Sequence, residues 1–237
     1  MVLGLVETLK AQGYAVVRNL FKEEELLEVS AASEQLIRGW QAREINSNDF
    51  GSYKTDEAPS PILYCIRHLE TKHPSFEQLG RSEPMKGIVR RVFGGPAMPT
   101  AFALIIKMPH YGGKVPYHSD PIDVPYGHVY NFSIYLDDSG PENGCFEVVP
   151  GSHLLPAKAG MFDEKPEGSV FVKTARGDVL IHDVRVVHGS AFSRSEKLRR
   201  SICVEFQPVE RLEKIGNKIL EHISAEQHTP IVRSVSS

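Results

Sequence analysis

Ala101-Phe-Ala-Leu-Ile-Ile-Lys-Met108 is the first of a series of short, β-prone runs that fill the second half of the sequence. Aliphatic, β-branched and aromatic residues dominate each run, and clusters of Gly, Pro, Asn and Asp separate most of them. Several short strands at this spacing are typical of a β-sandwich or a β-barrel. The sequence from about residue 101 to 207 therefore predicts a β core. The other five runs are 129–136, 145–149, 169–172, 178–182 and 201–206.

The first hundred residues carry helical patterns rather than strand patterns. Apolar residues recur at helical spacing over residues 2–12, and residues 22–40 form the clearest helix, with three glutamates at its start. A β-rich run occupies residues 14–21. Residues 62–93 are mixed and are expected to be mostly helical, with Met85–Phe93 as the best helix. Helices first and strands after predict a fold that is mainly β with flanking N-terminal helices.

The organisation along the chain favours one domain. Residues 41–61 are polar, so we expect a long loop there that acts as a lid or binding loop. The sequence has no internal repeat, low-complexity segment or linker. We therefore expect a single domain over residues 1–237, with a helical part over about 1–100 and the β core over about 101–207.

Composition and charge exclude several classes of protein. Hydrophobic residues make up 41% and charged residues 24% of the 237 residues, which excludes a disordered or fibrous chain. The formal net charge of -3 gives no electrostatic reason to expect nucleic acid or an anionic membrane as a partner. The sequence shows neither a membrane-length apolar run nor a signal-peptide pattern. Cys65, Cys145 and Cys203 are widely separated, which predicts reduced thiols and a cytoplasmic location.

The sharpest chemical motif is His118-Ser119-Asp120. In an extended segment alternate side chains share a face, so this histidine and this aspartate can reach one metal ion. His188, which follows a predicted strand, would complete a set of two histidines and one carboxylate. Such a set suits iron(II) and leaves coordination positions open for a chelating co-substrate and dioxygen. His182 lies six residues before His188 and is a rival for the same position.

An arginine near the last predicted strand fits the far carboxylate of a 2-oxo acid. Arginine binds a carboxylate bidentately and is always charged, which lysine does not match. Arg199 and Arg200 are both candidates, and alternation places them on opposite faces of the strand. Arg199 shares its face with smaller residues, which are suited to line a cavity, so we favour Arg199.

These motifs together resemble the phytanoyl-CoA dioxygenase family of iron(II)- and 2-oxoglutarate-dependent oxygenases. The resemblance runs from about residue 13 to 207 and is weakest over 41–100. The matching segments are Gly13–Phe21 with the acidic helix after it, Tyr117–Asp120, Tyr135–Asp138, Glu142–Cys145, Val148–His153, Gly177-Asp178, His188–Ser190 and Arg199–Ile202.

The resemblance implies a double-stranded β-helix, which is a cupin-like jelly roll, with iron and 2-oxoglutarate inside it. His118, Asp120 and His188 would be the catalytic iron ligands. Arg199 would hold the distal carboxylate of 2-oxoglutarate with Ser190 beside it. Asn131 and Ser133 would belong to the same pocket, although some relatives carry an aromatic residue at about Ser133. The retained carboxylate at Asp120 favours hydroxylation over halogenation, since related halogenases have Ala or Gly there.

The implied reaction is the hydroxylation of a small, polar molecule by dioxygen, with release of succinate and CO2. We expect Lys107, Tyr117 and Tyr135 to be substrate contacts. A wider set of polar candidates comprises Tyr64, Arg67, Asp123, Tyr126, Tyr130 and Arg185.

Two other functions remain open on the sequence. A cupin-type metalloenzyme, an isomerase or a dioxygenase, would use the metal without 2-oxoglutarate, and loss of Arg199 would then leave its activity unchanged. A non-catalytic binding protein on the same scaffold would keep its ligand affinity after loss of His118. The substrate, the oligomeric state and the pathway are not encoded in any motif that we identify.

Overall fold

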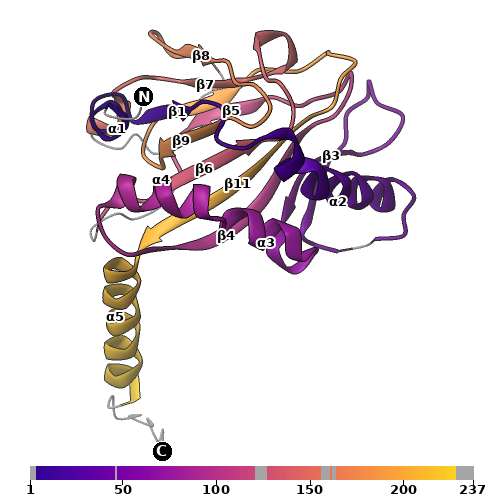
Figure 1. Cartoon of the computed structure of the whole chain (residues 1–237). Helices are drawn as coiled ribbons and strands as arrows, with labels where there is room; N and C mark the ends of the chain where they lie inside the picture. Colours follow the sequence, from indigo (N-terminus) through magenta and orange to yellow (C-terminus); the bar gives the residue numbers. More distant parts are fainter. Residues whose placement is uncertain (1–3, 46, 121–126, 156–160, 162–163, 228–237) are drawn as a thin grey trace, which may run out of the picture.

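The computed structural model describes residues 4–45, 47–120, 127–155, 161 and 164–227. Two antiparallel β-sheets face each other in it, and helices cover the outer side of the larger sheet (Figure 1). The helices are α1 (Leu5–Gln12), α2 (Glu23–Gln41), α3 (Pro74–Gly80), α4 (Glu83–Phe93) and α5 (Val209–Gln227), with short 3-10 helices at Leu69–Thr71, Pro141–Asn143 and Ser152–Leu154.

The larger sheet has seven strands in the order β1-β9-β6-β11-β4-β3-β2, and the smaller has four in the order β5-β10-β7-β8. This arrangement confirms the expected double-stranded β-helix, and all six β-prone runs form strands. The strands are β1 (Tyr14–Val17), β2 (Phe50–Tyr53), β3 (Ile62–Arg67), β4 (Ala97–Lys107), β5 (Val115–His118), β6 (Tyr130–Tyr135), β7 (Phe146–Val148), β8 (Val170–Val172), β9 (Val179–Asp183), β10 (His188–Ser190) and β11 (Arg199–Pro208).

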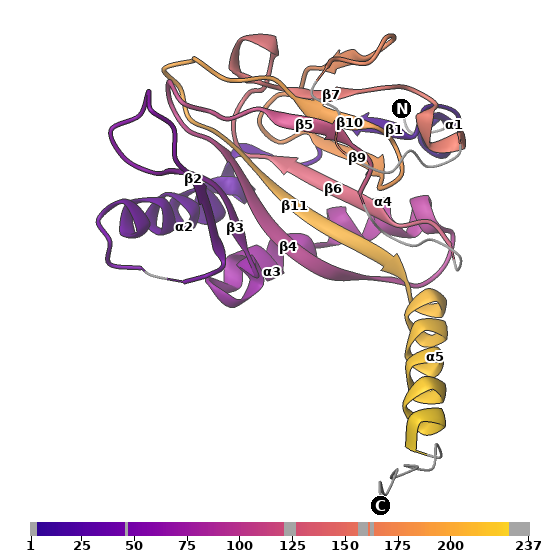
Figure 2. The same cartoon turned by 180° about the vertical axis from the view of Figure 1, so that it is seen from behind.

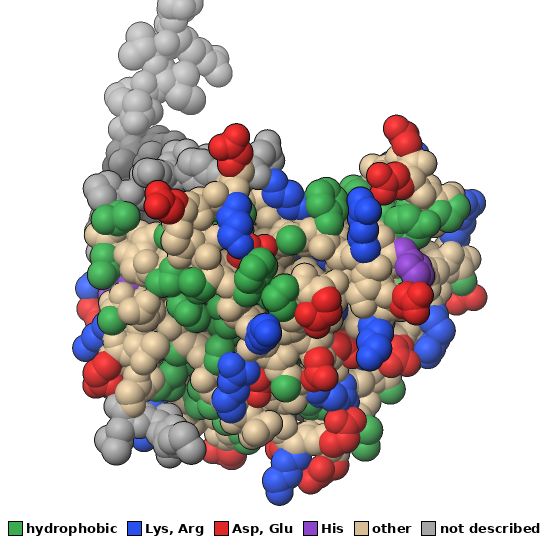
Figure 3. Space-filling view, turned by 90° about the horizontal axis from the view of Figure 1, so that it is seen from above, with side chains coloured by type: hydrophobic (Ala, Val, Ile, Leu, Met, Phe, Trp, Pro, Cys, Tyr) green, Lys and Arg blue, Asp and Glu red, His purple; other side chains and the backbone are tan. Residues whose placement is uncertain are grey.

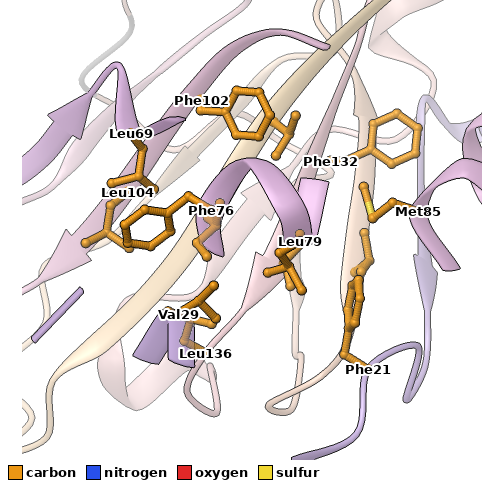
Figure 4. Packing of buried hydrophobic residues seen from close by; sticks show 14 of the residues in the cluster. Phe21, Val29, Leu69, Phe76, Leu79, Met85, Phe102, Leu104, Phe132 and Leu136 are labelled. Atoms are coloured by element: carbon orange, nitrogen blue, oxygen red, sulfur yellow. The ribbon is translucent and has the colours of Figure 1, made fainter. Parts of the chain in front are cut away.

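The main hydrophobic core lies between the outer face of the large sheet and the helices. Alternate residues of β4, β6 and β11, such as Leu104, Phe132 and Ile202, are fully buried there. Val29 of α2 and Phe76 of α3 reach the same layer, as Figure 4 shows. The opposite, inner face of the same strands carries the polar residues, because side chains alternate along a strand. The core therefore fixes which residues point toward the small sheet.

Residues 62–93 are mostly helical, as expected, and Met85–Phe93 lies in α4, but two segments of the N-terminal part differ from the expectation. Residues 62–67 form strand β3 rather than helix, and residues 50–53 of the expected loop form β2. A short apolar run such as Ile62–Ile66 has the same pattern in a buried strand and in a buried helix. Residues 62–67 form a strand because they pair with β4 and with β2, and hydrogen bonds between separate segments cannot be seen in the local pattern. The large sheet consequently contains three strands, β1, β2 and β3, that lie outside the β core predicted over 101–207.

The C-terminal helix α5 follows β11 directly and projects away from the two sheets (Figure 2). No helix in the described part of the chain is long and apolar enough to cross a membrane. Seen from above, Lys and Arg side chains alternate with Asp and Glu over the visible face (Figure 3).

Candidate active site

Three of the predicted ligands come together between the two sheets. His118 ends β5 and His188 begins β10, and these two residues are directly paired in the antiparallel ladder. Asp120 follows β5 by two residues, and its backbone N–H donates to Val184 O at 2.8 Å. One ligand atom from each of His118, Asp120 and His188 lies within 4.8 Å of the other two. The side-chain types and their spacing can hold one metal ion.

Hydrogen bonds leave the same nitrogen of both histidines free for a metal. His118 Nδ1 lies 2.8 Å from Pro116 O, and His188 Nδ1 lies 3.0 Å from Val186 O. A backbone carbonyl only accepts, so each Nδ1 carries a proton, and in the neutral ring Nε2 then offers its lone pair to a metal. The two rings are 4.4 Å apart between centroids. Local backbone therefore orients both imidazoles as metal ligands of this kind are oriented.

Asp120 is held in its ionised form. One of its oxygens lies 3.4 Å from His118 Nε2, and the other accepts a hydrogen bond of 3.0 Å from Asn131 Nδ2. Burial would raise the pKa of Asp120, but the hydrogen bond with His118 and the neighbouring histidines lower it below its usual value. Asn131, expected in the 2-oxoglutarate pocket, thus positions the carboxylate of the donor set.

His182 lies beside this set without joining it. Its ring packs against those of His188 and Phe146, with centroids 4.7 and 4.9 Å away. Its Nε2 lies 3.4 Å from Asn131 Nδ2, and Nδ1 has no hydrogen-bond partner among the described residues. Burial first, and then the neighbouring imidazole of His188, lower the pKa of His182 to about 3. This neutral ring is a wall of the site.

The two adjacent arginines of β11 have opposite surroundings. Arg200 faces the helices, where its guanidinium pairs with Asp137 at 2.9 Å and with Glu34 of α2 at 3.2 Å. Arg199 faces inward, is 4% exposed and donates to Gly144 O at 2.6 Å, while its Nε has no partner among the described residues. The buried, unpaired nitrogen favours Arg199 as the group that receives a carboxylate.

The other predicted co-substrate residues share this inner face. Ser190 lies two residues after His188 on β10, and Ser133 lies between Asn131 and Tyr135 on β6; both serines are buried. Tyr135 is also buried on this face, directly opposite Ser201 of β11.

Tyr117, expected to contact substrate, points to the other side of the small sheet. Its hydroxyl donates to Glu147 Oε2 at 2.6 Å, and Lys165 donates to the same oxygen at 2.7 Å. The ring crosses β10 at Gly189, where an added Cβ would lie 3.2 Å from Tyr117 Cδ1. Side chains alternate along β5, so Tyr117 must point outward because its neighbour His118 points inward. Tyr117 supports the sheet.

The wider set of candidates is scattered. Tyr130 packs in the outer core and Arg185 pairs with Asp183, whereas Arg67 lies on the inner face in register with Ala103. Tyr64 is 43% exposed and its ring lies 6.1 Å from that of Tyr53. Asp123 and Tyr126 lie outside the described residues. The expected lid, residues 41–61, includes part of the lining of a cavity of about 770 Å³ that Trp40 of α2 also lines.

Glu205 is an inward-facing charged residue that was not among the candidates from the sequence. This residue is directly opposite Asn131 on the inner face, and its Oε1 accepts from Thr100 at 2.5 Å and from Gln207 at 2.7 Å. Its partners fix one oxygen, and the second oxygen forms no hydrogen bond with the described residues. The alternation that placed Arg199 inward also places Glu205 inward, so that pattern could have identified it.

The donor set fits iron(II) on chemical grounds. Two imidazole nitrogens and one carboxylate form the mixed set that non-haem iron sites use, and three protein ligands leave further coordination positions for other molecules. Arg199, whose buried Nε has no partner among the described residues, is chemically suited to receive a carboxylate on the same inner face. This combination of jelly-roll fold, donor set and buried arginine is that of the iron- and 2-oxoglutarate-dependent oxygenase class.

Similarity to known proteins agrees with this class. The sequence profile of the phytanoyl-CoA dioxygenase family matches residues 9–201, and the chain belongs to that family. Phytanoyl-CoA dioxygenase domain-containing protein 1 from Bos taurus is 29% identical over 164 residues, which cover 61% of this chain. The match spans only 52% of the bovine protein, about half of its length.

Two solved structures are similar in fold. AviO1 from Streptomyces viridochromogenes is 34% identical with a TM-score of 0.78, over 87% of this chain and 95% of that one. EctD from S. alaskensis, solved with 2-oxoglutarate and 5-hydroxyectoine, has a TM-score of 0.72 over 88% of this chain and 77% of its own. At 19% identity, EctD supports the fold alone.

Proposed function

We propose that the protein is an iron(II)- and 2-oxoglutarate-dependent dioxygenase that hydroxylates a small, polar molecule and releases succinate and CO2. The observation that carries this proposal is the inward-facing set of His118, Asp120 and His188, with both Nδ1 atoms on backbone carbonyls. The unpaired Arg199 on the same face adds the second half of the proposal, namely 2-oxoglutarate. Relatives named as dioxygenases support the reaction type.

Each residue of the site has a definite task. His118 Nε2, His188 Nε2 and Asp120 would hold the iron, which supplies, with 2-oxoglutarate and dioxygen, the oxidising chemistry. Asn131 fixes the carboxylate of Asp120 through one oxygen. Arg199 would bind the distal carboxylate of 2-oxoglutarate and so orient that molecule.

The substrate would lie on the part of the inner face that the small sheet leaves uncovered. β4 and β11 have 11 and 10 residues, whereas the strands of the small sheet have three or four. Ala101 and Ala103 leave room there, and Glu205 and Arg67 provide charged groups at its borders. A carboxylate with one free oxygen favours a substrate with hydrogen-bond donors, in agreement with a polar molecule.

An anaerobic absorbance titration with iron(II) and then 2-oxoglutarate tests the proposal. We expect a weak visible charge-transfer band only when both are present, and no band in His188→Ala or Asp120→Ala. Arg199→Met should keep iron binding but require about 10- to 100-fold more 2-oxoglutarate, the loss expected for hydrogen bonds to a charged group. Arg90→Met, at an exposed arginine of α4, serves as the matched control.

The outcomes separate the alternatives. Iron binding without a band would reject 2-oxoglutarate as co-substrate and would favour a cupin-type metalloenzyme that works without it. Absence of iron binding would reject the donor set itself. After a positive titration, succinate release screens polar substrates, and uncoupled binding of a ligand without succinate would indicate the non-catalytic alternative.

A further inference from the structure

Lys107 and Arg199 are two buried cations that face each other across one strand pair. β4 and β11 run side by side in the large sheet (Figure 2), and the register places Lys107 directly opposite Arg199. Both side chains point to the inner face, with exposed fractions of 2% and 4%. Directly paired residues of an antiparallel ladder have Cα atoms only about 5 Å apart. Their charged ends are therefore confined to the same small volume.

Neither cation has a carboxylate partner among the described residues. Lys107 Nζ donates to Gly113 O and, at 3.0 Å, to Ala191 O, whereas Arg199 donates to Gly144 O. Carbonyl oxygens hold the two groups in place but do not neutralise their charge. The neighbouring Arg200, in contrast, has two carboxylate partners.

Such an arrangement is unfavourable unless an anion completes it. Burying an unpaired charge is costly, and two like charges in one pocket add repulsion. Lysine responds by losing its proton: burial first, and then the charge of Arg199, lower the pKa of Lys107 to about 7. Burial also lowers the pKa of Arg199. The other titratable groups that act on Lys107 are Glu147 and Cys145, and Glu147 is already bound by Tyr117 and Lys165.

We propose that Lys107 is a second cation of the pocket for the distal carboxylate of 2-oxoglutarate and binds it together with Arg199. This inference rests on the proposed function, and it moves Lys107 from the substrate contacts to the co-substrate pocket. Nζ has three donors, of which two are used by backbone carbonyls, so one remains for the ligand. Ala191, whose carbonyl holds Nζ, is the neighbour of Ser190, which links Lys107 to the same pocket.

The pocket then couples 2-oxoglutarate binding to a proton. A carboxylate beside Lys107 stabilises its charged form, so binding above about pH 7 takes up a proton on Nζ. The sign follows: because the bound state holds more protons than the free state, affinity for 2-oxoglutarate falls as the pH rises above the free-state pKa. Arg199 stays charged throughout this range and contributes no such dependence.

Anaerobic calorimetry on the iron-loaded protein tests both statements. Titrations with 2-oxoglutarate at pH 7 and at pH 8, each in two buffers of different ionisation enthalpy, give affinity and proton uptake together. We expect Lys107→Met to lower the affinity about 10- to 100-fold at pH 7 and to abolish the proton uptake. Lys107→Arg should keep most of the affinity and also lose the uptake. Lys86→Met, at an exposed lysine of α4, is the matched control.

A second ligand distinguishes direct binding of the distal carboxylate by Lys107 from a structural effect of its replacement. 2-Oxobutyrate lacks the distal carboxylate, so its affinity should be equal in the wild type and in Lys107→Met. Equal loss for both ligands, or an unchanged 2-oxoglutarate affinity in Lys107→Met, would overturn the inference. If Lys107→Met does not fold, the comparison of proton uptake between the wild type and Lys107→Arg tests the inference instead. Uptake in Lys107→Arg equal to that of the wild type would show that Lys107 is not the group that takes up the proton. A wild type that binds iron but not 2-oxoglutarate would refute the proposed function.

Discussion

At the scale of single residues, hydrogen bonds outside the donor set determine what the donor set can do. The carbonyls of Pro116 and Val186 select Nε2 of both histidines, and Asn131 fixes the free oxygen of Asp120. These three contacts come from the backbone or from a neighbouring strand. They orient the ligands before any metal binds, which reduces the entropy that metal binding must overcome.

Asn131→Ala should weaken iron binding roughly 10- to 100-fold, because partners of metal ligands typically contribute that much. Asn131→Asp should weaken it further, since a second carboxylate would then lie against Asp120. Competition with a chelator under anaerobic conditions measures the affinity. Asn217→Ala, at an exposed position of α5, is the control. Iron bound as tightly by Asn131→Ala as by the wild type would show that Asp120 needs no partner.

At the scale of elements, the small sheet works because its short strands are closely packed. β10 has only three residues, and it carries His188, Gly189 and Ser190 in sequence. The middle residue must be glycine because Tyr117 lies across it to reach Glu147. Inward His188 and Ser190 and the outward tyrosine are thus parts of one packing arrangement. The strand both presents a ligand and locks the sheet.

Gly189→Ala should destabilise the fold by about 1–3 kcal/mol, the usual effect of overpacking. The added Cβ would lie 2.9 Å from Val115 O, and a backbone atom can relieve this only by moving β10 or β5. Since β10 carries His188, iron affinity should fall as well. Gly87→Ala is the matched control, because nothing lies within 4 Å of a Cβ there. Urea unfolding gives the difference, and equal stability of Gly189→Ala and the wild type would contradict the packing described.

At the scale of the whole molecule, the large sheet separates two functions by its two faces. The outer face builds the core with α2, α3 and α4, and the inner face carries the polar site (Figures 1 and 4). Buried charges occur where segments from distant parts of the chain meet. Asp183, at the end of β9, is 1% exposed and joins His128 before β6 to Arg185 after β9.

The stability of the protein should depend on Asp183 in acid. Burial would raise the pKa of Asp183, but hydrogen bonds from Arg185 and His128 hold it far below its usual value. Because the folded-state pKa is depressed, this contribution is complete above the unfolded value of about 3.9 and is lost as the pH falls below it. Asp183→Asn should be less stable at pH 7, and the difference should shrink below pH 4. Urea unfolding from pH 3 to 7 measures it; a difference independent of pH would refute the assignment.

The sequence by itself determined the features that are local in the chain. His118 and Asp120 lie two residues apart on an extended segment, so one face was assured by strand geometry alone. Alternation along residues 199–206 likewise separated Arg199 from Arg200, because it depends on the chain and not on its neighbours. Period and composition were enough to predict the strands of the β core and the long helix α2.

Tertiary structure decided everything that depends on partners distant in sequence. Strand β3 exists because β4 and β2 pair with it, and no local pattern distinguishes it from a helix. Tyr117 and Lys107 were both expected to contact substrate. Tyr117 instead points outward and donates to Glu147, and Lys107 lies directly opposite Arg199. Asn131, expected in the co-substrate pocket, donates to Asp120, a residue eleven positions earlier in the chain. Side-chain direction and hydrogen-bond partners follow from strand register, which is set by the packing of the whole core and is therefore not contained in any single segment.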